Sequence, residues 1–146
     1  MKASEFFNPE ERKQIEQAIL KAELNTSGEI RVHVEISFRG KLLDRAATVF
    51  ARLGMHKTAL RNGVLFYLSV KNRKFAVIGD TGINNVVPVN FWDEIRAVME
   101  DHFRNSQFAE GLSKGVMMAG EQMKKNFPYQ KDDVDELPDE ISFGKI

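Results

Sequence analysis

The sequence contains no cysteine, and this absence excludes a disulfide framework, a thiolate nucleophile and a cysteine-ligated zinc site. The first residues, MKASEFFNPEERKQIEQ, lack the apolar core of a signal peptide. Apolar runs of the roughly 20 residues needed to span a bilayer are also missing. We therefore expect a cytoplasmic protein with no membrane span.

An overall excess of one charge is missing too, because the 21 basic and 21 acidic residues cancel. Residues 132–140, however, hold six of the acids, which leaves residues 1–131 with a net charge of about +5. Binding of nucleic acid usually needs a denser basic face with exposed aromatic side chains, so we expect no nucleic-acid partner. We expect residues 1–130 to form a single domain and residues 131–146 an acidic C-terminal tail. The tail is expected either to be solvated or to fold back on the basic hairpin around residues 71–74.

Four segments show the periodicity of amphipathic helices. The first begins with Asn8 as a cap and Pro9 in the first turn, and it continues to about Asn25. The others are expected over about residues 42–53, from near Asn90 past Phe103, and over about 107–125. In the last one, Gly111, Gly115 and Ala119 recur every four residues, which predicts a close approach to a neighbouring helix.

Three segments favour strands. EIRVHVEIS, from Glu29, alternates apolar and polar residues, which predicts one buried and one solvated face near the edge of a sheet. GVLFYLSV (63–70) is apolar almost throughout and should be central, and FAVIG (75–79) should return antiparallel after the turn KNRK. The order α-β-α-β-β-α-α predicts an α/β fold, with helices on both faces of a small mixed sheet.

The motifs TSGEIRV (26–32), RNGVLFYLSVKNRKFAVIGDTGIN (61–84) and FAEGLSKGV (108–116) resemble the TPM domain family. The resemblance covers roughly residues 10–127 and implies a Rossmann-like α/β/α sandwich. It also implies a choice of roles, because some members show weak acid-phosphatase activity, one modulates an acetylcholine receptor, and some bind divalent cations. Many members carry a signal peptide or a membrane anchor, and neither is recognisable in this sequence.

The predicted topology brings three polar residues to one end of the sheet. Glu29 starts the first strand, Asn62 precedes the second, and Asp80 follows the third. Their side-chain oxygens are hard donors, which suit Ca²⁺ or Mg²⁺, and Gly79 and Gly82 would allow a sharp turn around Asp80. The alternative is that Asp80 caps a turn and that Glu29 pairs with Arg31 or Arg61.

The opposite end of the sheet is basic. The residues there are Arg39, Lys41, Lys71, Arg73 and Lys74, which would suit an anion such as phosphate. The alternative is a solvated hairpin rich in cations. The resemblance to the TPM domain favours the end with Glu29 and Asp80 as the functional one.

We expect a module that binds a divalent cation or a protein partner without strong catalysis. The alternative is a weak, metal-dependent acid phosphatase acting on phosphate monoesters, with an ion held by Asp80 and Glu29. Known catalytic patterns do not support it, because the partner motifs of metallophosphatases are missing and the one Asp-x-Asp pair (133–135) lies in the tail.

Overall fold

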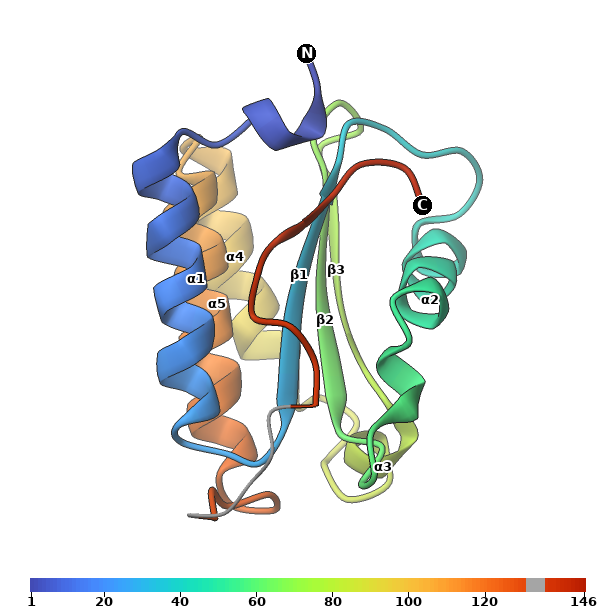
Figure 1. Cartoon of the computed structure of the whole chain (residues 1–146), viewed down its shortest axis with the longest axis vertical. Helices are drawn as coiled ribbons and strands as arrows, with labels where there is room; N and C mark the ends of the chain where they lie inside the picture. The colour runs from blue at the N-terminus through green and yellow to red at the C-terminus, as the bar shows by residue number, and fades with distance from the viewer. Residues whose placement is uncertain (131–135) are drawn as a thin grey trace.

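The chain folds into a four-stranded mixed sheet with helices on both faces, as Figure 1 shows, which confirms the predicted α/β sandwich. The computed structural model describes residues 1–130 and 136–146. The strands are β1 (Glu29–Glu35), β2 (Gly63–Ser69), β3 (Lys74–Gly79) and β4 (Ser142–Phe143). The helices are α1 (Pro9–Glu23), α2 (Leu42–Arg52), α3 (Thr81–Asn84), α4 (Asp93–Arg104) and α5 (Phe108–Met123), with short 3-10 turns η1 (Ala3–Glu5) and η2 (Met55–Lys57).

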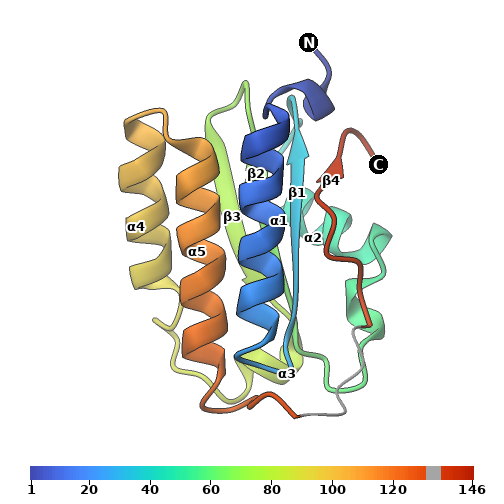
Figure 2. The same ribbon diagram turned by 60° about the vertical axis from the view of Figure 1, so that its left-hand side comes forward.

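Helices α1, α4 and α5 cover one face of the sheet, and α2 covers the other (Figures 1 and 2). The expected cap at Asn8 is present, since its Oδ1 accepts a hydrogen bond from the Glu11 amide at 2.8 Å. The small residues of α5 pack as predicted: a Cβ at Gly115 would lie 2.5 Å from Sδ of Met99 in α4. None of the described helices is long and apolar enough to cross a membrane.

The strands lie in the order β3-β2-β1-β4. Strands β1 and β2 are parallel, with Glu29 opposite Gly63 at one end and Glu35 opposite Ser69 at the other, while β3 returns antiparallel to β2. The two ends of the parallel pair therefore carry different residues. We call the end where β1 and β2 begin the N-terminal rim, and the end where they finish, beside the β2–β3 turn, the C-terminal rim.

The prediction of a solvated face on β1 is wrong, because all seven residues of β1 are buried. Strand β1 lies between β2 and β4 and not at the edge of the sheet. Its alternating polar residues are covered by the C-terminal segment: Arg31 Nη2 donates to the carbonyl of Glu140 at 3.2 Å, and the His33 ring contacts Ser142. The alternation of apolar and polar residues in β1 therefore corresponds to one apolar and one polar face, both of which are buried.

The segment 136–146 lies along β1 and close to α2 (Figures 1 and 2). Two of its residues are buried, Leu137 against the α2 side of the sheet and Ile141 against the α1 side. The described part of the acidic tail thus packs on the body beside β1, and not on the β2–β3 hairpin. Residues 131–135, which include the Asp-x-Asp pair, lie outside the described residues.

Candidate functional site

The N-terminal rim brings the backbones of the three predicted ligand residues together. The Glu29 amide donates to the carbonyl of Asn62 at 3.2 Å, and the Asp80 amide donates to the carbonyl of Gly63 at 2.9 Å. Parallel pairing of β1 with β2 aligns their first residues, and the antiparallel return of β3 ends at the same place. The juxtaposition predicted from topology is therefore confirmed.

The Asp80 side chain is engaged in a two-point ion pair with Arg61. Arg61 Nε lies 2.8 Å from Oδ2 and Nη2 lies 2.9 Å from Oδ1, and Oδ1 also accepts the Thr81 amide at 2.7 Å. Burial raises the pKa of Asp80, but the hydrogen bonds from Arg61 and Thr81 outweigh burial and hold that pKa below its ordinary value. Asp80 is thus an ionised carboxylate that caps the short helix α3, as the alternative for this residue expected.

The loop that carries Arg61 is pressed against α3. A Cβ on Gly82 would lie 2.1 Å from the carbonyl oxygen of Leu60 and 2.5 Å from that of Arg61, so only glycine fits there. Arg61 itself has a left-handed φ of 50°, which is uncommon for a residue with a side chain. This close contact keeps two loop carbonyl oxygens within reach of the start of α3.

Glu29 and Asn62 have different partners. Glu29 Oε1 accepts the Glu136 amide at 2.7 Å, so this carboxylate fastens the C-terminal segment and does not pair with Arg61. The Asn62 amide nitrogen Nδ2 donates to the carbonyl of Ser27 at 3.3 Å. Within residues 1–130 and 136–146, no three acidic or imidazole side chains cluster in a way that could hold a metal ion. Any ion at this rim would therefore depend on a mixture of carboxylate, amide and carbonyl oxygens.

The five predicted anion-binding residues at the C-terminal rim are divided between two places. Arg73 and Lys74, in the β2–β3 hairpin, line a cavity together with Arg104 from the end of α4. Lys71 is exposed in the same hairpin but does not line that cavity, and neither do the exposed Arg39 and Lys41, which precede α2. The structure thus places two of the five around a common space.

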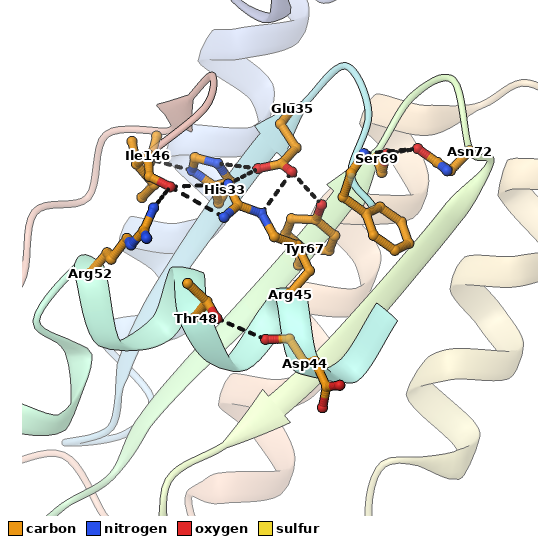
Figure 3. A network of polar contacts seen from close by, with 12 residues as sticks. His33, Glu35, Asp44, Arg45, Thr48, Arg52, Tyr67, Ser69, Asn72 and Ile146 are labelled. Atoms are coloured by element: carbon orange, nitrogen blue, oxygen red, sulfur yellow. Dashed lines mark hydrogen bonds and ion pairs between the residues drawn. The ribbon is translucent and has the colours of Figure 1, made fainter. Parts of the chain in front are cut away.

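A buried polar network, absent from the sequence predictions, lies between the sheet and α2 (Figure 3). Glu35 is its centre: Oε1 accepts hydrogen bonds from the Tyr67 hydroxyl at 2.8 Å and from Arg45 Nε at 2.9 Å, and Oε2 accepts Arg45 Nη2 at 2.8 Å. His33 Nε2 lies 3.3 Å from Glu35 Oε2, and His33 Nδ1 lies 2.8 Å from the hydroxyl of Ser142. The network therefore connects β1, β2, α2 and β4.

Burial and hydrogen bonding together set the protonation states of this network. Burial lowers the pKa of His33 below its ordinary 6.5, although the Glu35 carboxylate opposes that shift. Burial raises the pKa of Glu35, but hydrogen bonds from Arg45 and Tyr67 outweigh it and lower that pKa overall. Burial and the bond to Glu35 raise the pKa of the Tyr67 phenol. At neutral pH the network holds one carboxylate paired with one guanidinium, beside a neutral imidazole and a neutral phenol.

Comparison with known proteins identifies the family. The family model of the TPM domain matches residues 1–122. The chain belongs to the TPM domain family. Its structure superposes on the NMR structure of the BA42 protein from the psychrophilic bacterium Bizionia argentinensis with a TM-score of 0.92 and 46% sequence identity, covering 99% of each chain. It shares its fold with the N-terminal domain of a P. gingivalis protein, at a TM-score of 0.68 and 19% identity over 87% of this chain and 83% of that one. A comparison with curated proteins gives no match.

The matched region contains both rims of this TPM domain but ends before the C-terminal segment. Ser142, which contacts His33, therefore lies beyond the family match, whereas the likeness to the BA42 protein extends over it. The signal that indicates the network is the strictly polar face of residues 29–35 together with the apolar ISFGKI at the end of the sequence. An apolar segment with no predicted place in the fold, such as ISFGKI, can pack over the polar face of a strand such as residues 29–35.

Proposed function

We propose that this TPM domain is a divalent-cation-binding module, with Ca²⁺ or Mg²⁺ held at the N-terminal rim by oxygens of Asp80, Glu29 and Asn62. One observation carries the proposal: the starts of β1 and β2 and the end of β3 meet at this rim, directly beside an ionised, nearly buried Asp80. Ca²⁺ and Mg²⁺ prefer such hard oxygen ligands, including loop carbonyls and waters. The bound ion would supply positive charge at the rim.

The residues present fit a weak metal site, in which the ion competes with protein partners for its ligands, better than a preformed site with free ligands. Each proposed ligand has a protein partner, and the strongest competitor is Arg61, which holds both oxygens of Asp80. The Arg61 side chain is half exposed, whereas that of Asp80 is nearly buried, so an ion would displace the guanidinium rather than move the carboxylate. The displaced Arg61 side chain would then be free to pair with an acidic group of a protein partner. Binding of a metal ion and binding of a partner would in this way be linked.

Titration with CaCl₂ and MgCl₂, followed through backbone amide NMR signals, tests the site residue by residue. We expect the signals of residues 29, 62 and 80–82 to shift with increasing metal, and Asp80→Asn to abolish those shifts. Asparagine keeps an acceptor for the Thr81 amide, so the variant should remain folded. The matched control is Asp93→Asn, which removes an exposed carboxylate at the start of α4. Equal responses from both variants, or none from the parent protein at millimolar metal, would contradict the proposal.

The second candidate is a weak, metal-dependent acid phosphatase acting on phosphate monoesters. It is supported only by the family model, which bears the name TPM phosphatase, and by the same oxygen-rich rim. The ion would supply Lewis acidity and an activated water, while Asp80 would position it. Hydrolysis of 4-nitrophenyl phosphate with Mg²⁺ or Ca²⁺ separates the candidates, because Asp80→Asn must remove all turnover that belongs to this chain. Activity that survives the substitution would originate elsewhere.

A further inference from the structure

The C-terminal rim contains a cavity of about 660 Å³ between the β2–β3 hairpin and the turn that joins α4 to α5. These two turns lie beside each other at the top of Figure 2, close to the N-terminal turn. The volume falls in the range of small-molecule sites, about 300–1,000 Å³. The cavity is at the opposite end of the sheet from Asp80 and is independent of the proposed cation site.

The wall of this cavity is a continuous row of aromatic rings. Phe6 and Phe108 meet edge to face at 5.4 Å between ring centres, Phe108 stacks on Phe103 at 5.5 Å, and Phe103 meets Phe75 at 5.0 Å. All four side chains are only partly buried, although each has aromatic neighbours. The fold therefore leaves apolar surface facing a hollow, where burial by a ligand would be favourable.

The lining of the cavity also carries cationic side chains. Arg73, Lys74 and Arg104 line it, and the one acidic side chain of the lining, Glu100, pairs with Arg104 at 2.7 Å. Within the described parts of the chain, the side chains of Arg73 and Lys74 make no ion pair or hydrogen bond. Two cations are therefore uncompensated beside an aromatic wall.

Both turns that frame the cavity hold a residue in a costly backbone conformation. Arg73 has φ of 52° and Ser106 has φ of 59°. A left-handed conformation at a residue other than glycine costs free energy, and such residues gather at ligand sites. Arg73 contributes a cationic side chain to the lining of the cavity, which glycine could not supply.

We propose that this cavity binds an organic anion that combines an apolar acyl body with a single carboxylate. The body would lie along the phenylalanine row, and the carboxylate would accept charge-assisted hydrogen bonds from Arg73 and Lys74. A free inorganic anion would leave the aromatic wall uncovered, and an apolar cation would meet uncompensated positive charge. The complementarity of charge and apolar surface thus selects an amphipathic anion.

Isothermal titration with decanoate, below its micelle concentration, tests the proposal against two matched probes. Acetate carries the same carboxylate without the chain, and decyltrimethylammonium carries the same chain with a cation. We expect decanoate to bind, acetate to bind far more weakly, and decyltrimethylammonium not to compete with decanoate. In amide NMR spectra, decanoate should shift the signals of residues 70–75 and 103–108.

The variant that isolates the charge is Arg73→Gly with Lys74→Gln, because glycine tolerates the left-handed conformation and stability should not fall. We expect its affinity for decanoate to fall about tenfold, which is typical of a lost charge-assisted contact. The matched control, Lys71→Gln, removes an exposed cation of the same hairpin outside the cavity and should keep the affinity of the parent protein.

Three results would overturn the proposal. Equal binding of decyltrimethylammonium and decanoate would make the cavity a site for apolar chains of any charge. An equal loss of affinity in Lys71→Gln and in the double variant would reduce the effect to general charge. Binding to phosphatidylglycerol vesicles without binding to decanoate would assign the rim to a membrane surface instead.

Discussion

Arg61 holds both carboxylate oxygens of Asp80, with Nε 2.8 Å from Oδ2 and Nη2 2.9 Å from Oδ1. The pair is asymmetric, because the Asp80 side chain is 5% exposed and the Arg61 side chain 49%. The carboxylate is therefore fixed, while its partner can leave into solvent. This asymmetry makes the N-terminal rim a place where a second cation can compete for one anion.

Arg61→Gln should raise the affinity of the rim for Ca²⁺ several-fold. The substitution removes the positive charge that a metal ion must displace from Asp80 but leaves the carboxylate and the loop in place. Calcium titration by amide NMR, at equal protein concentration, measures the change. Arg96→Gln, which removes a partly exposed arginine that pairs with Asp93 and donates to the Val77 carbonyl, is the matched control and should leave the affinity unaltered. A weaker Ca²⁺ affinity in Arg61→Gln would mean that Arg61 organises the site rather than competes for it.

Gly82→Ala should lower the free energy of unfolding by about 3 kcal/mol, because the new methyl group would overlap the carbonyl oxygens of Leu60 and Arg61. It should also weaken metal binding by displacing the loop. Urea denaturation measures the first effect. Gly40→Ala is the control: its φ is 83° but no atom lies within 4 Å, so only the conformational cost of about 1 kcal/mol applies. Similar losses for the two variants would show that the loop yields easily.

Arg45→Met should destabilise the protein more than Tyr67→Phe. The first leaves the buried Glu35 carboxylate without its counter-ion, at a cost of about 3–5 kcal/mol, and the second removes one hydrogen bond, at about 1–2 kcal/mol. Thermal and urea unfolding of both variants gives the comparison. Arg104→Met breaks the exposed pair with Glu100 and should change stability by less than about 1 kcal/mol. The reverse order would mean that Arg45 is solvated.

His33 should make stability depend on pH below its ordinary pKa of 6.5. Burial keeps the folded imidazole neutral, whereas the unfolded imidazole binds a proton near pH 6.5, so the unfolded state takes up more protons as the pH falls. Stability is then unaffected above this value and declines below it, by up to about 1.4 kcal/mol per pH unit. His33→Gln should flatten the stability curve below the ordinary pKa of 6.5. His56→Gln, at an exposed position, is the matched control. An unchanged slope in His33→Gln would show that His33 is protonated in the folded state.

Ile141→Ala should cost about 2–4 kcal/mol, because this side chain is 7% exposed and belongs to the core on the α1 side of the sheet. The substitution should also loosen β4 and increase hydrogen exchange at the amides of β1. Val89→Ala, at a fully exposed position, is the control and should change stability by less than about 0.5 kcal/mol. A neutral Ile141→Ala would mean that the C-terminal segment contributes little to the fold.

The elements whose signals are local could be predicted from the order of the amino acids alone. Asn8 and Pro9 defined the start of α1, and apolar runs defined β2, which is buried on both faces, and β3, which pairs with it at the edge of the sheet. Their order then settled the parallel pair and the hairpin, and with them the meeting of Glu29, Asn62 and Asp80. Element order fixes which strand ends share a rim, so this part of the candidate site followed from topology alone.

The partner of each polar side chain, in contrast, depends on how distant segments pack and could not be predicted. Arg61 could have paired with Glu29 or with Asp80, and in the structure it pairs with Asp80, while Glu29 accepts the amide of Glu136. The alternating polar face of β1 predicted contact with water. In the structure Ser142, more than 100 residues later, contacts His33, and Arg45 of α2 pairs with Glu35, so both side chains are buried in a network. Hydrophobic periodicity indicates on which side of a strand a residue lies. It does not indicate whether that side is covered by water or by a distant segment of the chain.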